Sequence, residues 1–152
     1  MEKLSIKEQL YRQCLAYTEM RFETINNTIS EIQESMLSET KSSAGDKHET
    51  GRAMLQLERE KAGSQLAEIE KTKQNLSKIN IENSVKSIGL GSVVFTTQFN
   101  YFIAISAGEL TVEDQTFYAI SANTPIGKLL IGKSVGDVVN FRNMKIEVVD
   151  II

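Results

Sequence analysis

The sequence contains few of the residues that most catalytic sites and disulfide frameworks use. Tryptophan is absent, there is one cysteine, one histidine and one proline among 152 residues, and aromatic residues make up only 7%. The single Cys14 forms no disulfide within the chain, and its place in a helical pattern favours a small apolar packing residue. One histidine and one cysteine provide no catalytic triad, and neither a cluster of metal ligands nor a phosphate-binding glycine loop is present. The residues themselves therefore do not predict an enzyme.

Charge and hydropathy exclude further classes of protein. The net charge is −3 at pH 7, which argues against binding nucleic acid through a basic face, and we expect no sequence-specific DNA binding. No apolar run approaches the ~20 residues of a membrane span, and Met1–Leu4 shows no signal-peptide pattern. We expect a soluble, cytoplasmic protein. Its 41% apolar residues are enough for a core, and its length fits one domain or a small domain plus an extension.

Apolar residues in the first half of the sequence recur every seven residues. Neither glycine nor proline interrupts the stretch from Ser5 to Glu39, and a second helical pattern runs from Lys47 to Ile79. Narrow rows of this kind are typical of a coiled coil. Gly51 and Gly63 each lower helix propensity by about 1 kcal/mol relative to alanine, so the second helix needs a partner. The predicted rows are Leu15, Phe22, Ile29 and Met36, with Tyr11, Thr18, Ile25 and Ile32 between them, and Leu55, Ala62, Ile69 and Leu76, with Leu66 beside them.

A polar stretch that contains glycine, Ser42–Thr50, separates the two helical patterns. Gly45 supplies backbone freedom, while Asp46 and Glu49 have the spacing of a capping box at a helix start. Helices of matched length joined by a short loop favour an antiparallel hairpin over residues 1–80, with its turn at 42–46. A parallel coiled coil of two copies is the alternative. It would leave the turn unexplained, so we expect a monomer.

Composition changes near Asn80, and β-branched and aromatic residues dominate after Gly89. The expected fold class is α+β, with a small antiparallel sheet that curls around one short helix in a second domain, residues 81–152. That helix is predicted at Thr124–Gly132, because threonine caps it, proline occupies its first turn and glycine closes it. The predicted strands are Ser92–Gln98, Tyr101–Ser106, Thr116–Ser121, Val138–Phe141 and Met144–Ile151.

The segment Ile120–Asp137 resembles the C-terminal domain of the bacterial Gre transcript-cleavage factors. That family shows Ile-Ser, then Ser/Thr-Pro-Leu/Ile-Gly/Ala, then a hydrophobic pair before Gly-Lys, and finally Gly-Asp; the chain has each of these in order. The family also places an antiparallel coiled coil before this domain, with Gly-Asp-x-x-Glu-Asn at the tip. Here the corresponding segment is Gly45-Asp46-Lys47-His48-Glu49-Thr50. The resemblance covers about Glu31 to Ile152 and implies an FKBP-like C-terminal domain.

The resemblance also implies a partner and a role. Gre factors insert their coiled coil into the secondary channel of RNA polymerase and stimulate the cleavage of RNA by the polymerase itself. By this resemblance Asp46 and Glu49 are the catalytic and metal-binding residues. They hold Mg²⁺ only in the complex, and the isolated protein has no cofactor. Asn123, Thr124, Pro125 and Ile126 are then expected to form an exposed or partly exposed patch that contacts the rim of the channel.

The chain departs from the Gre pattern in a few places. Thr50 replaces the usual asparagine, Lys47 replaces an apolar residue, and the tyrosine that normally follows is missing. The usual Pro-Met-Thr opening is missing too. One alternative is therefore a regulator that occupies the channel without cleavage and competes with Gre factors. A second is a coiled-coil adaptor for an unrelated protein. His48 is the only histidine, and we expect its side chain to be solvated and to have no specific role.

Overall fold

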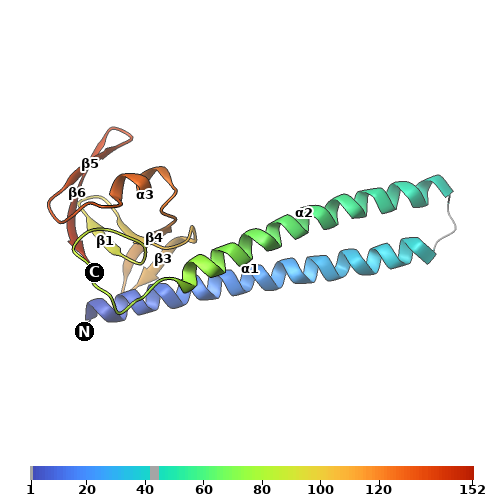
Figure 1. The fold of residues 1–152 in the computed structure, drawn as a ribbon, viewed down its shortest axis with the longest axis horizontal. Coiled ribbons are helices and arrows are strands. Elements are labelled where there is room, and N and C mark those ends of the chain that lie inside the picture. Colours follow the sequence, from blue (N-terminus) through green and yellow to red (C-terminus); the bar gives the residue numbers. More distant parts are fainter. Residues whose placement is uncertain (1, 42–44) are drawn as a thin grey trace. The chain divides into compact units, whose positions relative to one another are not determined.

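A computed structural model describes the backbone of residues 2–41 and 45–152, and the side chains of residues 6–39 and 49–152 (Figure 1). It has the expected α+β class. Helices α1 (Glu2–Lys41) and α2 (Gly45–Ser77) are followed by a six-stranded mixed sheet and one short helix. Among the described residues, no helix is both long enough and apolar enough to cross a membrane. The remaining elements are β1 (Val93–Thr96), β2 (Asn100–Ile103), β3 (Gly108–Val112), β4 (Gln115–Ile120), α3 (Pro125–Leu130), β5 (Val138–Phe141) and β6 (Met144–Ile151).

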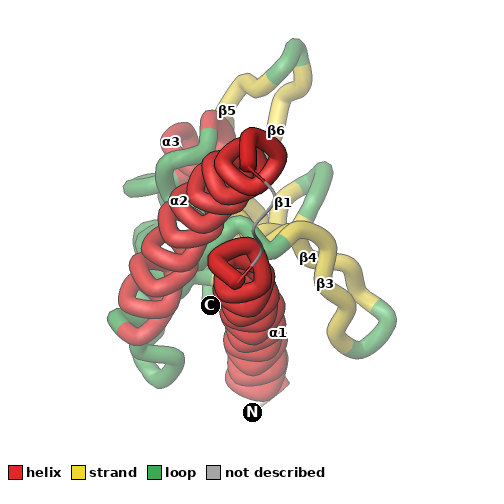
Figure 2. The backbone as a smooth tube through the Cα atoms, turned by 90° about the vertical axis from the view of Figure 1, so that its right-hand side faces the viewer, coloured by secondary structure: helices red, strands yellow, loops and turns green. Residues whose placement is uncertain are grey.

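The chain divides into two compact units, and the central parts of α1 and α2, Thr18–Lys73, form one of them. In this unit the two helices run antiparallel and lie side by side (Figure 2). The direction follows from two sets of neighbours. Lys73, late in α2, has its Nζ 3.0 Å from Oε1 of Glu19 and 4.4 Å from the centre of the Phe22 ring, whereas Leu55, early in α2, lines a groove with Ser35, later in α1. The predicted antiparallel arrangement is therefore confirmed here. The buried centre of the unit is Ile29, Ile32 and Ala62, flanked by half-buried Ile25, Met36, Leu55 and Leu66.

One position in the predicted rows is wrong. Leu15 is 39% exposed, whereas its neighbour Cys14 is fully buried. Along the first turns of α1 the buried residues Ile6, Leu10 and Cys14 are spaced by four instead of alternating between three and four. These turns pack on the sheet as well as on the end of α2, and the second contact rotates the buried stripe around the helix. The interpretation of Cys14 as a packing residue is confirmed.

The other unit consists of the chain up to Tyr17 together with Gln74–Ile152. Its strand order is β3-β4-β2-β1-β6-β5. The expected fully antiparallel sheet is wrong, because β2 and β4 pair in parallel, with Tyr101 opposite Tyr118. The reason is strand β3, which the sequence analysis missed. From β2 the chain crosses to the sheet edge, forms β3, and returns through a hairpin as β4, which lies between β3 and β2 and so points the same way as β2.

Both faces of the sheet are buried. On one face Phe102 and Phe117 pack with Leu10 of α1 and Leu76 of α2. Three polar bonds to the backbone fasten α1 there: Lys7 Nζ donates to the carbonyl of Asn83 (2.7 Å), the Tyr11 hydroxyl to Leu76 (3.2 Å) and Gln13 to Thr111 (3.0 Å). Burial lowers the pKa of Lys7. The other face is covered by α3, and its buried residues are Ile88, Val94, Tyr101, Ile103, Ile126, Leu130, Val139, Ile146, Val148 and Ile151.

Replacing Gly91 with alanine is expected to destabilise this unit by roughly 2 kcal/mol or more, because two costs add. Gly91 has φ +90°, and a Cβ at this position would lie 2.8 Å from Cγ2 of Ile79. Gly108→Ala is the matched control, since Gly108 has φ +80° but open space around it. It should cost only the backbone strain, about 1 kcal/mol. Urea unfolding of both variants measures the difference. Equal losses of unfolding free energy in the two variants would show that the Ile79 side chain moves aside without an energetic cost.

Candidate functional site

The predicted tip residues lie at the start of α2. Asp46 belongs to its first turn, while its side chain, like those of Lys47 and His48, and the turn residues 42–44 fall outside the described part of the structure. Glu49 is exposed. Because the backbone is helical from Gly45, positions 46 and 49 are neighbours on one turn. Carboxylates here also interact favourably with the helix dipole.

This arrangement suits a shared metal better than a resident one. Mg²⁺ is commonly held by one or two carboxylates together with phosphates and waters. Two neighbouring residues on one turn, with Glu49 exposed to solvent, could provide only part of such a ligand set. Within the described side chains, no group of three or more histidines, cysteines or carboxylates could hold a metal ion. The roles of Asp46 and Glu49 remain predictions.

The predicted docking segment forms the start of α3. Asn123 and Pro125 are exposed and Thr124 is half-buried, as expected, but Ile126 is only 8% exposed and packs in the core under α3. The expectation that Ile126 contributes to an exposed patch is therefore wrong. Helix α3 is short, and Ile126 is the apolar residue of its first turn that packs against the sheet. A partner could reach Asn123, Pro125 and part of Thr124.

Hydrogen bonds hold this corner of the chain in place. The Thr124 hydroxyl accepts a bond from the N–H of Gly127 (3.1 Å), as a helix cap, and donates one to the carbonyl of Ser121 (2.7 Å). The N–H of Asn123 donates to the Ser121 hydroxyl (3.2 Å). A Cβ on Gly127 would lie 2.5 Å from the Ser121 carbonyl oxygen, so a glycine allows the close approach. The exposed Asn123 and Pro125 are thus presented on a well-supported backbone.

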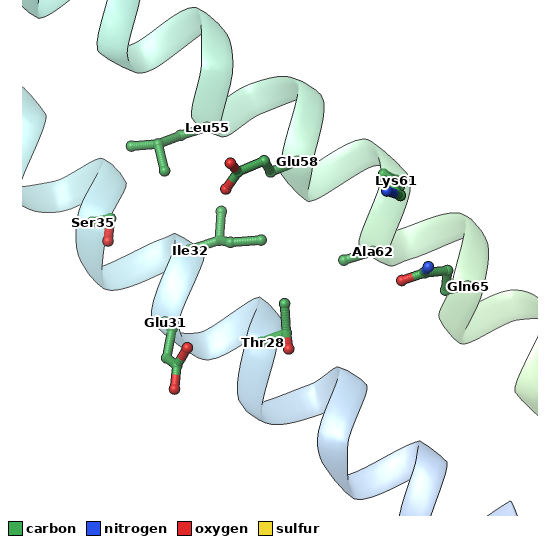
Figure 3. A pocket seen from close by; sticks show the side chains of 9 residues that line it. All are labelled: Thr28, Glu31, Ile32, Ser35, Leu55, Glu58, Lys61, Ala62 and Gln65. Atoms are coloured by element: carbon green, nitrogen blue, oxygen red, sulfur yellow. The ribbon is translucent and has the colours of Figure 1, made fainter.

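A groove that the sequence analysis did not predict lies between α1 and α2 in the Thr18–Lys73 unit (Figure 3). Its volume is about 470 Å³. Ala62 is the small residue of its row and faces Thr28 across the groove, and the carboxylate of Glu58 lies between the helices on the side of Ile32 (Figure 3). Of the other lining residues, the polar ones are exposed to solvent and Leu55 is half-buried. The groove is lined by Thr28, Glu31, Ile32, Ser35, Leu55, Glu58, Lys61, Ala62 and Gln65.

Cys14 does not qualify as a nucleophile. Its side chain is fully buried, and burial raises the pKa of the thiol to about 12. The thiol therefore stays neutral at physiological pH, and only the thiolate is reactive.

Comparison of the sequence with protein-family models gives no match, and comparison with curated proteins gives none either.

Proposed function

We propose that this protein is an auxiliary transcription elongation factor that binds RNA polymerase through its secondary channel. One observation carries the proposal. The chain combines an acidic first turn of α2, with Asp46 and Glu49, and the Ile120–Asp137 segment with its Gre-like order of motifs. The antiparallel α1–α2 pair of the Thr18–Lys73 unit supports it, because a narrow helical pair is a shape that can enter a channel. We assign the sheet domain to the FKBP-like class and the protein to the cytoplasm.

The tip carboxylates would act only inside the complex. When bound there, a shared Mg²⁺ supplies charge stabilisation and activation of the attacking water for RNA cleavage. Asp46 and Glu49 would provide two negatively charged oxygen ligands at the start of α2, and the remaining ligands would have to come from the polymerase and the RNA phosphate. This protein is then not itself an enzyme.

A transcript-cleavage assay on backtracked polymerase tests the proposal. Wild-type protein should shorten the RNA from its 3′ end, and the Asp46→Ala/Glu49→Ala double variant should not. Both should bind polymerase equally, because the substitutions leave the α3 corner unchanged.

Pro125 is proposed to contact the polymerase rim together with Asn123. Pro125→Ala should weaken binding to core polymerase about fivefold, or ~1 kcal/mol, while the melting temperature stays within about 2 °C. The domain tolerates the change because Pro125 is exposed and Thr124 still caps the helix. Fluorescence titration against polymerase gives the affinity. Unchanged affinity would mean that Pro125 only begins the helix.

A non-cleaving channel regulator is the second candidate, and the substitutions at Lys47 and Thr50 favour it. In that case wild-type protein would compete with a Gre factor for polymerase without any shortening of the RNA. An adaptor for an unrelated partner would bind no polymerase at all.

A further inference from the structure

The sheet has two edge strands, β3 and β5. The outer side of an edge strand presents backbone N–H and carbonyl groups that can pair with a strand of another chain. Part of the β3 edge is already used, because Nε2 of Gln13 on α1 donates to the carbonyl of Thr111 (3.0 Å). Helix α3 packs on the core side of β5, where Ile126 and Leu130 share a cluster with Val139. Strand β5 lies at the margin of the sheet unit (Figure 1), and within the described part of the chain no hydrogen bond reaches its outer side.

The pairing of β5 with β6 determines which backbone groups of β5 face outwards. The N–H of Thr97 donates to the carbonyl of Glu147 (3.0 Å), so the backbone of Glu147 on β6 faces away from β5. Val138 lies opposite Glu147, and it therefore directs its own N–H and carbonyl to the free side. Because this direction alternates along a strand, Asn140 does the same. Each of these two residues offers one donor and one acceptor at the outer edge.

These outward groups match those of a second copy of the same strand. When two β5 strands run antiparallel about a two-fold axis at Val139, Val138 of each copy lies opposite Asn140 of the other. Each such pair exchanges two N–H···O bonds, so every outward donor and acceptor on both strands finds a partner. The two-fold register centred on Val138 fits less well. It would need Gly136, whose N–H already donates to the carbonyl of Val148 (2.8 Å).

The charges at the ends of β5 are complementary in this register. Phe141 of one copy would lie opposite Asp137 of the other, and the Arg142 guanidinium lies over the Phe141 ring, 5.0 Å from its centre. Among the described residues Arg142 has no ion pair, and Asp137 accepts through Oδ2 alone, from the N–H of Ser134. The cation of each copy therefore lies beside a carboxylate of the other, and such complementarity favours this partner over others.

The charges on β6 do not oppose the contact. Strand β5 itself contains no charged residue. Lys145 and Glu147 on β6 lie opposite Asn140 and Val138. In the two-fold pair, Lys145 of one copy and Glu147 of the other would therefore belong to the same row of side chains. Opposite charges share that row, and like charges do not face each other.

We propose that a second copy of this chain pairs with β5, which gives a weak two-fold symmetric dimer with one continuous sheet. The pairing is short because β5 ends at the Arg142–Asn143 turn and the chain leaves the edge at Gly136, where φ is +95°. A pair of four-residue strands buries far less than the ~1,600 Å² of a standard interface, so the protein is a monomer in dilute solution. The contact differs from a two-copy coiled coil and goes beyond the proposed function.

Analytical ultracentrifugation of the full-length protein tests the dimer. The weight-average mass should rise from that of one copy at about 10 µM to nearly that of two at about 1 mM, with a Kd on the order of 100 µM. Hydrogen exchange then tests the register. Over the same range the N–H groups of Val138 and Asn140 should exchange about fourfold more slowly, because about four fifths of the chains are then paired. The N–H of Glu109, on the β3 edge, should not change.

Two variants test the contact itself. Asn140→Pro removes an outward N–H, and proline is tolerated on an edge strand, so the dimer should weaken about 30-fold or more. Glu109→Pro is the matched control on the β3 edge and should change Kd less than about twofold. Arg142→Glu should weaken the dimer about tenfold by charge reversal. Glutamate suits this turn, because Glu113 begins the β3–β4 turn with a similar φ of +52°. Circular dichroism and thermal melting confirm that all three variants are folded.

Each contrary outcome overturns a stated part of the proposal. A single-copy mass up to about 1 mM would overturn the dimer, and a mass beyond two copies would overturn the closed two-fold pair. An unchanged dimer in Asn140→Pro, or protection of N–H groups elsewhere, would overturn β5 as the contact. An unchanged Kd in Arg142→Glu would overturn the register. None of these measurements involves polymerase, so each of these results leaves the proposed function intact.

Discussion

Replacement of Asp46 by asparagine is expected to reduce transcript cleavage on the order of 100-fold or more, because it would remove a charged ligand of the metal that we propose is shared with the polymerase. Affinity for polymerase should change less than about twofold, since the docking residues are elsewhere in the chain. The readout is the rate of RNA shortening in backtracked complexes at saturating protein. The same variant should bind Mg²⁺ as poorly as wild-type protein when polymerase is absent.

The choice of asparagine removes the charge of Asp46 and keeps the size of its side chain. Helix α2 begins at Gly45, so Asp46 lies inside the first turn and not at the predicted cap position. The substitution loses the interaction of the carboxylate with the helix dipole, about 0.3–1 kcal/mol, so the melting temperature should fall by no more than about 4 °C. Full cleavage by Asp46→Asn would show that the charge of Asp46 is not needed in the complex.

Truncation of Leu76 to alanine is expected to cost roughly 2–5 kcal/mol of unfolding free energy. Leu76 is fully buried in the core that it shares with Leu10, Phe102 and Phe117, so the change leaves a cavity where helix ends and sheet meet. Leu57→Ala on the same helix is the control, since Leu57 is 66% exposed and should cost less than about 0.5 kcal/mol. Urea unfolding followed by circular dichroism measures both. Similar losses for the two would contradict the assigned core.

The sequence predicted the long helices well because seven-residue repeats persist over many turns. The prediction failed at Leu15. There α1 also packs on the sheet, and this contact buries Cys14 and leaves Leu15 exposed. A seven-residue repeat carries no information about such a contact. The start of α3 and the strand Met144–Ile151 were predicted because their patterns are local: a Thr-Pro cap in one case, and in the other an alternation that runs from Met144 to Val149.

Strand β3 was missed for a physical reason. Four of its five residues are exposed or half-buried, so Gly108–Val112 shows little hydrophobic alternation, and it begins with a glycine. Without it the return of the chain as β4, parallel to β2, could not be inferred.

The candidate sites differ in the same way. The tip and the α3 corner could be proposed from the sequence because each is a short contiguous motif, and their roles stay predictions, whereas the burial of Ile126 depends on the sheet beneath it.

Site-specific crosslinking from the tip tests the central claim most directly. Thr50 is exposed next to Glu49, and a photoreactive reagent attached to a Thr50→Cys variant would label selectively, because the native Cys14 is buried and neutral. In complex with RNA polymerase, the reagent should crosslink to residues that line the secondary channel beside the active centre. Crosslinks confined to the outer surface of the polymerase, or none at all, would contradict the account.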